Sequence, residues 1–463
     1  MVNSDDDSTL RPPLGRTLSG SMPPSHRLIS VRSSFLLFLL YVPAYSDVDV
    51  SQPPFLIFWN APTRPCLDSH GVAIDLSSYD IIINQNQSFL GPEVMIFYNN
   101  QLGLYPYYDQ NDEAVNGGLP QNASLGEHLD KVHQDLTTFM ADKNFTGVAV
   151  VDWEHWRPLW DRNWEGMLLY QQRSLQLLSQ WHPNWSFGKL RKVAKRQFEA
   201  AAQDFMAATL QLCRQHRPGG LWGFYGFPEC YNFENKNSSK KYSGRCPRGE
   251  VRRNDQQSWL WNISRALYPH IYLGRELQGS GHVRPFIRHR LQEAIRVSQL
   301  PGGAELPVLP YARIVYTHSM DFLTADDLIQ TIGQSAAMGA TGVILWGNSD
   351  YSSSKDSCLA VKSYVDETLG RYLKNVTTAV SMCSRGRCSG NGRCVRRRSY
   401  SDDHLHLDPQ IFTIEKDPQG KGYMVNRRRP GMDAVWPQFQ CRCYTGWRGR
   451  DCSQKGANIS GVP

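Results

Sequence analysis

Short apolar runs rich in β-branched and aromatic residues alternate with longer segments of helical periodicity along most of the chain. The runs predict strands at Phe55–Asn60, Val94–Asn99, Gly147–Glu154, Gly220–Phe227, Tyr268–Leu273, Pro307–Tyr316 and Gly342–Gly347. The intervening segments predict helices near 125–142, 163–182, 188–216, 253–267, 283–298 and 325–339, the last N-capped by Thr324 with Asp327. Seven or so strand–helix repeats favour an α/β fold with a (β/α) barrel over an open, doubly wound sheet.

The pattern changes after residue 375, where cysteine, arginine and glycine replace helical periodicity. Six of the eleven cysteines lie between Cys383 and Cys452. The ending Cys441-Arg-Cys443-Tyr-Thr-Gly-Trp-Arg-Gly-Arg-Asp-Cys452 has the spacing of an EGF-like module, in which disulfides replace a core. We therefore expect a barrel at 47–375 and a small disulfide-rich module at 376–463.

Charge is also concentrated in this second part. The chain carries a net charge of +7, and the stretch from Cys383 to Pro430 holds eleven Lys or Arg against five Asp or Glu. The larger part is close to neutral, so the total charge does not indicate a nucleic-acid-binding protein. The basic stretch is instead expected to form a long loop within the module.

The N-terminal 46 residues resemble a secretory signal peptide with a long extension before it. The apolar run Phe35–Val42 follows Arg27 and Arg32 and precedes the small-residue pattern Ala44-Tyr-Ser46. This run is too short to span a bilayer. Together with the cysteines it predicts a secreted or lysosomal protein, with Asn122, Asn237 and Asn375 as the favoured glycan acceptors among eight Asn-x-Ser/Thr sequons.

Two acids stand at the end of one apolar run, Gly147-Val-Ala-Val-Val-Asp152-Trp-Glu154. Side chains two positions apart in a strand share a face, roughly 6–7 Å apart, and the carboxyl ends of barrel strands form the mouth where active sites are built. Because neighbouring carboxylates repel, one of them is driven toward its protonated form, as glycosidases require. A solvated strand end or a helix N-cap pair is the alternative interpretation.

Other predicted strands end in aromatic residues expected to face the same mouth: Tyr98, Tyr225, Tyr272, Tyr316 and Trp346. Sugar rings have apolar faces and hydroxyl rims, so a mouth lined by tyrosine, tryptophan and a few acids suits a carbohydrate. Each aromatic residue taken alone is also consistent with a place in the core. The combination favours a carbohydrate-binding site.

Several long motifs resemble the animal hyaluronidase family, which are glycoside hydrolases of family 56 with a distorted (β/α) barrel. The motifs are Asp152-Trp-Glu-His-Trp-Arg157-Pro, Met95-Ile-Phe-Tyr98, Gln101–Pro106, Gly223-Phe-Tyr225-Gly-Phe-Pro228, Ala266-Leu-Tyr-Pro269 and Val343-Ile-Leu-Trp346. Gly118–Ser124 and Gly226–Asn232 bring the chain closest to the type 1 members. The resemblance runs from about Pro54 to Cys452 and implies hydrolysis of hyaluronan.

The resemblance also implies a role for each site residue. Glu154 would act as general acid and then as base, while the substrate's own N-acetyl oxygen attacks the sugar. Asp152 and Tyr272 would orient that acetamido group. The remaining substrate contacts would come from Tyr98, Tyr225, Trp346, Arg157 and Arg290, although the two arginines also suit structural roles. His270, two residues before Tyr272, is expected to be a surface histidine.

The same resemblance implies the disulfides Cys66–Cys358, Cys230–Cys246, Cys383–Cys394, Cys388–Cys441 and Cys443–Cys452. It leaves Cys213 as a buried small residue rather than a reactive thiol. No cofactor and no metal is expected, and hyaluronan is the expected partner of a monomer without a membrane span. Two alternatives stay open: a member of the same family that prefers chondroitin, and a non-catalytic hyaluronan-binding or adhesion protein.

Overall fold

The computed structural model describes residues 54–233, 242–301, 305–429 and 435–456. These residues belong to one compact unit, Asp49–Pro463. The expected signal segment and the sequon at Asn237 lie outside the described residues. None of the helices within them combines the length and apolar character needed to cross a membrane.

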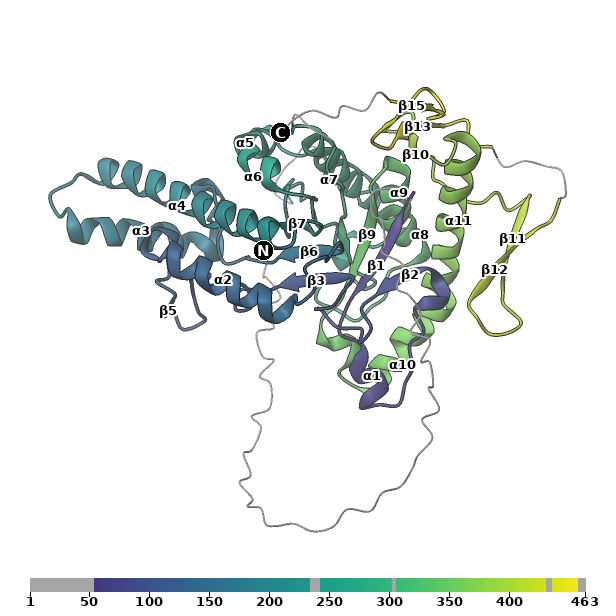
Figure 1. The fold of residues 1–463 in the computed structure, drawn as a ribbon, viewed down its shortest axis with the longest axis horizontal. Coiled ribbons are helices and arrows are strands. Elements are labelled where there is room, and N and C mark those ends of the chain that lie inside the picture. Colours follow the sequence, from purple (N-terminus) through teal and green to yellow (C-terminus); the bar gives the residue numbers. More distant parts are fainter. Residues whose placement is uncertain (1–53, 234–241, 302–304, 430–434, 457–463) are drawn as a thin grey trace, which may run out of the picture. The chain divides into compact units, whose positions relative to one another are not determined.

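Parallel strands form the centre of the fold (Figure 1). One sheet has the order β2-β1-β9-β8 and the other β3-β6-β7, and every pair in them is parallel. Their bounds are β1 Leu56–Asn60, β2 Ile81–Ile83, β3 Val94–Phe97, β6 Val148–Val151, β7 Leu221–Phe224, β8 Tyr311–Ala312 and β9 Gly342–Trp346. The strands predicted at Phe55–Asn60, Val94–Asn99, Gly147–Glu154, Gly220–Phe227, Pro307–Tyr316 and Gly342–Gly347 are correct in place but longer than those observed, and β2 had not been predicted.

The two sheets are joined through residues 267–270. Single parallel bridges link Tyr225 to Tyr268, Leu267 to Val308, and His270 to Tyr311. The predicted strands Tyr268–Leu273 and Pro307–Tyr316 are therefore present mainly as isolated bridges. They complete one continuous series of parallel segments from β3 to β2.

A side chain spans the gap between the two ends of this series. Asn84, which follows β2 and is buried, donates from Nδ2 to the Val94 carbonyl at 2.8 Å. Its Oδ1 accepts the backbone N–H groups of Glu93 and Val94 at 3.1 Å. β2 and β3 are thus connected by an amide side chain rather than by a ladder, which gives the distorted (β/α) barrel that the sequence predicts.

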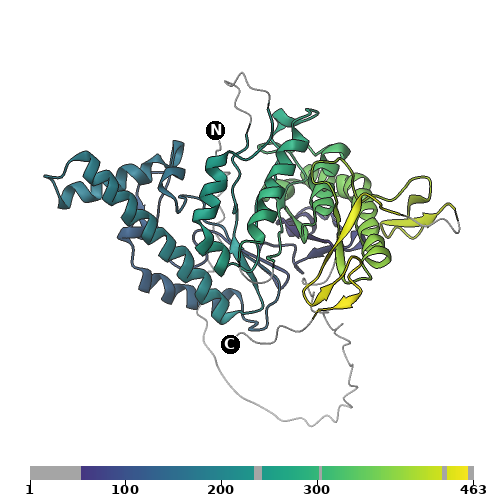
Figure 2. The ribbon, with the colours of Figure 1, turned by 90° about the horizontal axis from the view of Figure 1, so that it is seen from above.

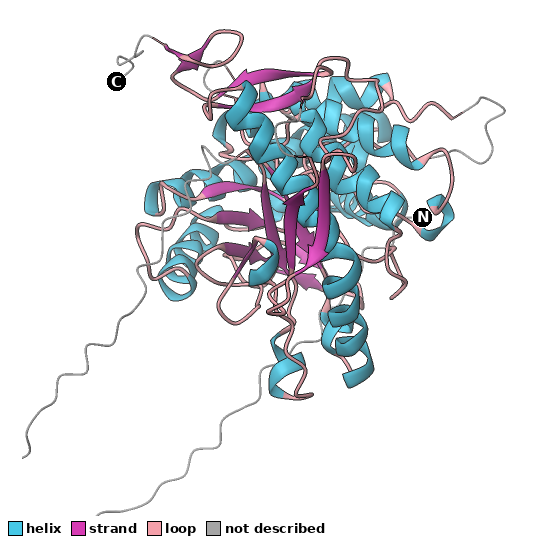
Figure 3. Cartoon of the chain, turned by 90° about the vertical axis from the view of Figure 1, so that its right-hand side faces the viewer, coloured by secondary structure: helices cyan, strands magenta, loops and turns pink. Residues whose placement is uncertain are grey.

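Helices cover the outside of these strands (Figure 3). They are α1 Arg64–Asp68, α2 Leu125–Phe139, α3 Leu168–Trp181, α4 Phe187–His216, α5 Arg248–Gln256, α6 Ser258–Ile263, α7 Val283–Ser298, α8 Ala325–Leu328, α9 Gln334–Met338, α10 Lys355–Tyr364 and α11 Gly370–Arg387. Ser124, Ser186 and Thr324 cap their helices as N-cap acceptors, Thr324 as predicted. In place of one helix predicted at 253–267 there are two, α5 from Arg248 and α6 from Ser258, and α1, α10 and α11 had not been predicted.

Strands after α11 are antiparallel and short. β10 Gly392–Arg396 pairs with β13 Phe439–Cys443, β11 Phe412–Lys416 with β12 Tyr423–Arg427, and β14 Trp447–Arg448 with β15 Gln454–Lys455. The remaining hairpin, β4 Tyr107–Tyr108 with β5 Ala114–Val115, lies in the loop after β3. The EGF-like character expected of the C-terminal segment stays a prediction.

The boundary expected at residue 375 falls inside α11, so the two parts are not separated there. The buried face of α11, including Leu373, Val376 and Val380, runs through that position without interruption. Phe439 and Cys452 belong to the same hydrophobic cluster as the outer face of β1. The C-terminal segment therefore packs on the barrel, and the expected division into two domains stays a prediction.

Candidate active site at the carboxyl ends of the strands

The two acids lie where β6 ends. Val148 and Val150 point into the barrel interior, whereas Ala149 and Val151 contact the surrounding helices. The backbone N–H of Asp152 still donates to the Phe97 carbonyl at 2.8 Å, which fixes the start of the loop. Strand alternation therefore directs Asp152 to the interior side of the mouth.

Asp152 lies in a setting that disfavours its charge. Its Oδ1 is buried and has no hydrogen-bond partner among the described residues. Burial, and after it the charge of Glu154, hold the pKa of Asp152 well above its ordinary value, while Arg157 acts in the opposite direction. Both effects favour the protonated form of Asp152 over that of a solvent-exposed aspartate.

Four aromatic side chains surround the acids. The side chains of Tyr225 and Tyr272 are hydrogen-bonded, with ring centroids 6.3 Å apart. Tyr272 also stacks on Trp346 at 6.1 Å, and Trp346 Nε1 donates to the Tyr98 hydroxyl at 3.1 Å. Burial raises the pKa of Tyr98, Tyr225 and Tyr272, and the charge of Asp152 raises each further. These three hydroxyls consequently stay protonated and available as donors.

Tyr316 does not reach this mouth, so that expectation is wrong. Its hydroxyl donates to Asp327 Oδ2 at 2.5 Å, on the outer side of the barrel. Leu309 and Tyr311 lie in the interior cluster, and strand alternation places Arg313 next on that face. Arg313 accordingly takes the place at the mouth, with its guanidinium 5.1 Å from the Trp346 ring centroid and 5.9 Å from that of Tyr272.

Sequence reasoning missed Arg313, although a signal for it existed. In Leu309-Pro-Tyr311-Ala-Arg313 the arginine shares the strand face of two apolar residues, which is an unusual place for a cation. Arg313 also hydrogen-bonds to Tyr351. Its charge lowers the pKa of Tyr272 against the larger effect of burial.

Arg157 lies behind the acids instead of facing solvent. It is 7% exposed, and its Nη1 donates to the Glu154 carbonyl at 3.2 Å. Its Nη2 lies 3.6 Å from Glu154 Oε1 and 3.6 Å from Oε1 of Glu229, a buried acid that the sequence had not singled out. Burial raises the pKa of Glu229, and the charge of Arg157 opposes this. The guanidinium therefore bridges one acid of the mouth to one acid of the interior.

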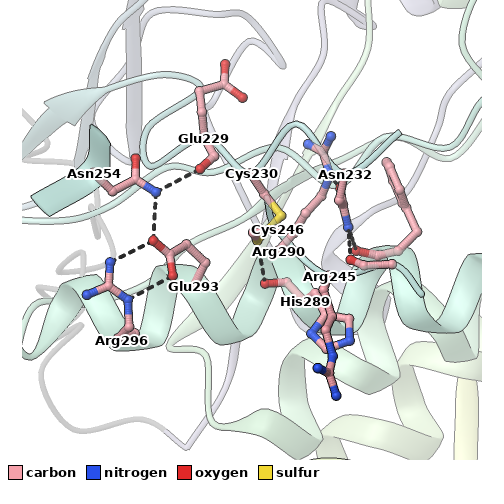
Figure 4. Close-up of a disulfide and its surroundings, with 12 residues drawn as sticks. Glu229, Cys230, Asn232, Arg245, Cys246, Asn254, His289, Arg290, Glu293 and Arg296 are labelled. Atoms are coloured by element: carbon pink, nitrogen blue, oxygen red, sulfur yellow. Dashed lines mark hydrogen bonds and ion pairs between the residues drawn. A yellow bond between two sulfur atoms is a disulfide. The ribbon is translucent and has the colours of Figure 1, made fainter. Parts of the chain in front are cut away.

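Arg290 is buried as well, at 3% exposure. Its Nε donates to Asn232 Oδ1 at 2.9 Å and its Nη1 to the His270 carbonyl at 3.1 Å. Figure 4 shows Arg290 and Asn232 beside the Cys230–Cys246 disulfide. The Glu229 carbonyl accepts a hydrogen bond from Asn254, while the Glu229 carboxylate points away from Asn254. Contact with a substrate carboxylate was expected for Arg157 and Arg290. Because both side chains are buried, the structure favours structural roles for them instead.

His270 is packed among the site tyrosines and is not the surface residue expected. Its ring lies 6.0 Å from that of Tyr225 and 5.7 Å from that of Tyr272. Its Nδ1 is buried without a hydrogen-bond partner in the described part of the chain. Burial, then the charges of Arg290 and Arg157, lower the pKa of His270 well below its ordinary value, so the ring is neutral.

Five disulfides are present, in the pairs that the resemblance implied: Cys66–Cys358, Cys230–Cys246, Cys383–Cys394, Cys388–Cys441 and Cys443–Cys452. Cys213 is a free, buried thiol whose pKa is raised by burial. Of the favoured sequons, Asn122 is exposed, and Asn375 is half-buried with its Oδ1 accepting the Leu407 N–H at 2.7 Å. The structure thus leaves Asn122 the more accessible of the two.

Known proteins resemble this chain over nearly its whole length. A family model described as hyaluronidase matches residues 46–456. Hyaluronidase-1 of Sus scrofa and of Homo sapiens are each 44% identical to the chain, over 93% and 92% of it and 99% and 98% of those proteins. The crystal structure of bee venom hyaluronidase in complex with a hyaluronic acid tetramer matches with a TM-score of 0.64 and 33% identity, over 69% of this chain and 98% of that one.

Proposed function

The chain belongs to the hyaluronidase family of glycoside hydrolases, and on this premise we propose that it cleaves hyaluronan by substrate-assisted, retaining hydrolysis of β-1,4 bonds. The observation that carries the proposal is the buried Oδ1 of Asp152, which has no hydrogen-bond partner within the described ranges and lies beside Glu154 and the hydrogen-bonded tyrosines. An unpaired buried acceptor is costly unless a ligand completes it. An acetamido N–H of the substrate is the donor that fits.

Binding of that acetamido group prepares Glu154 to act as the acid. An N–H donor at Asp152 Oδ1 favours the carboxylate form of Asp152, and because neighbouring carboxylates repel, the protonated form of Glu154 is then favoured. Tyr272, whose raised pKa keeps it protonated, donates to the acetamido oxygen and holds it toward the anomeric carbon. The substrate's own oxygen is then placed to form the new bond.

Glu154 carries the proton through both halves of the reaction. It donates the proton to the glycosidic oxygen as the bond to the anomeric carbon breaks and the acetamido oxygen bonds to that carbon. Glu154 next removes a proton from water, which attacks the same carbon and releases the acetamido group. Arg157 holds Glu154 through its carbonyl and its carboxylate, so we assign it a positioning role.

The aromatic side chains supply the walls of the cleavage subsite. Trp346, held by its hydrogen bond to Tyr98, presents a flat face beside the acetamido position, and Tyr225 supports the sugar ring through its contact with Tyr272. The guanidinium of Arg313 lies against the rings of Trp346 and Tyr272, and we add Arg313 to the residues that the family resemblance implied for this wall.

We further propose that the protein acts as a monomer in a secretory, extracellular or lysosomal compartment. The five disulfides support an oxidising route of synthesis. A non-catalytic hyaluronan-binding protein would not need the acid pair and its tyrosine partners, all of which are in place.

Product analysis tests the function. Purified protein should convert hyaluronan to even-numbered oligosaccharides with N-acetylglucosamine at the reducing end, and should cleave chondroitin more slowly. Unsaturated products would indicate a lyase. Faster cleavage of chondroitin would establish the chondroitin-preferring alternative, and binding without cleavage of either polymer would contradict the proposal.

A further inference from the structure

α3 and α4 form a long hairpin that extends away from the strands (Figures 1 and 2). Where α4 passes the loop after β6, Lys195 pairs with Asp161 at 2.9 Å and the Trp160 N–H donates to Glu199 Oε1 at 2.9 Å. At the other end of α4, Arg217 Nε donates to the carbonyl that follows α2, near the amino ends of the strands. The first turns of α4 therefore continue past the mouth, roughly 18 Å beyond Glu199.

The tip of this hairpin carries unusually exposed aromatic side chains. Trp181 at the end of α3 and Phe187 at the start of α4 are each 68% exposed. Between them, the ring of Trp185 stacks on His182 at 3.8 Å and receives Lys189 Nζ on its face at 3.9 Å. Two large apolar side chains held in solvent beside a rigid stack are typical of a binding surface.

Basic side chains continue from the aromatic tip along α4. Residues 187–196 contain five Lys or Arg and no Asp or Glu. Lys189, Lys192 and Arg196 are exposed, and their i, i+3, i+7 spacing places them in one stripe roughly 10 Å long. The tip thus joins flat aromatic faces to a row of positive charge.

We propose that this surface, formed by Trp181, Trp185, Phe187, Lys189, Lys192 and Arg196, binds a glucuronate-bearing polysaccharide chain outside the catalytic mouth. Aromatic faces stack on sugar rings, and a linear row of cations matches carboxylates repeated along a chain. A membrane fits less well, because the exposed face of α4 beside the tip is basic and lacks an apolar stripe. The proposal rests on the proposed function, since it takes the same polymer as the ligand.

A triple variant, Lys189→Gln with Lys192→Gln and Arg196→Gln, tests this role. A variant with Lys416→Gln, Lys421→Gln and Arg428→Gln is the matched control, because it removes the same charge from exposed positions around the β11–β12 hairpin. For each protein, kcat and KM are measured on long hyaluronan and on the shortest oligosaccharide that the wild type cleaves, at low and high salt. A second tip variant, Trp181→Ala with Phe187→Ala, tests the aromatic part.

The tip variants should raise KM for the polymer by roughly threefold or more, with a weaker dependence on salt, and leave kcat and KM for the oligosaccharide unchanged. The control should match the wild type on both substrates, and a misfolded variant would lose oligosaccharide cleavage. Polymer KM equal to that of the control would overturn the proposal. The proposal would also be overturned if a tip variant lost binding to phosphatidylserine vesicles, or lost self-association, while its KM for the polymer stayed unchanged. If the wild type cleaves neither substrate, the proposed function itself fails.

Discussion

Replacing Arg157 by methionine should destabilise the protein in a pH-dependent way. Arg157 is buried, and its Nη2 lies 3.6 Å from one oxygen of each of Glu154 and Glu229. At an effective dielectric constant of about 20, the contact with buried Glu229 corresponds to an attraction of roughly 4–5 kcal/mol before desolvation is counted. The contact with Glu154, whose side chain is 38% exposed, is weakened by solvent screening. Removing one member of such a buried pair costs about 3–5 kcal/mol, because the remaining charge has no partner.

The pH dependence follows from Glu229. Its pKa is already raised by burial, and losing Arg157 removes the largest opposing charge. A carboxylate with a raised pKa in the folded state penalises folding at high pH, and the penalty is relieved as pH falls and the group takes up a proton. We therefore expect the variant to lose about 3 kcal/mol of unfolding free energy at pH 7.5, and clearly less at pH 4.5.

Urea denaturation of the oxidised protein at both pH values measures the loss of unfolding free energy. Glu229→Gln is the second single variant of the double-mutant cycle. The double variant Arg157→Met with Glu229→Gln should recover most of the loss at pH 7.5, since no buried charge is then left alone. The kcat of the single variant should fall more than KM rises, because Arg157 positions Glu154. The account would be refuted if Arg157→Met destabilised the protein equally at both pH values. It would also be refuted if the loss in the double variant equalled the sum of the losses in the two single variants.

Three further outcomes are expected. Asn84→Ala should lower the unfolding free energy by about 2–4 kcal/mol in urea denaturation, because the backbone N–H groups of Glu93 and Val94 lose their acceptor; an unchanged value would show that β2 and β3 are held together otherwise. Burial lowers the pKa of His404 and of His406 to about 4, so from pH 6.5 down to 4 the unfolded chain takes up protons that the folded protein does not and stability falls. Replacing both histidines by glutamine should flatten that part of the stability curve, by up to about 1.4 kcal/mol per histidine and pH unit. The buried thiol of Cys213 should react with a thiol reagent in urea but not in the native protein, and rapid native labelling would contradict its burial.

Local sequence predicted the strand that carries the acids, because the alternation of apolar residues up to Asp152 and Glu154 is set by neighbours in the chain. The same rule, applied to the residues before Tyr316, would have placed Arg313 at the mouth and Tyr316 outside. The prediction considered only the last residue of the run Pro307–Tyr316, and for that reason it selected Tyr316 and overlooked Arg313.

Other features depend on residues distant in the sequence. The burial of Arg157 follows from its pairing with Glu229, which reaches it from the loop after β7. His270 is packed among aromatic rings because Tyr225, which follows β7, lies against its ring. The continuation of α11 past residue 375 reflects an apolar face that packs in a cluster shared by the barrel and the C-terminal segment. No local pattern contains these partners.

The central claim is that Glu154 alone carries the proton while Asp152 directs the substrate's acetamido group. The most direct test is the rate of hyaluronan cleavage by Glu154→Gln relative to the wild type, measured between about pH 3.5 and 7.5. The account predicts a loss of at least about 10²-fold at every pH, with the variant still folded and still binding hyaluronan. Activity close to that of the wild type at any pH in this range would contradict it.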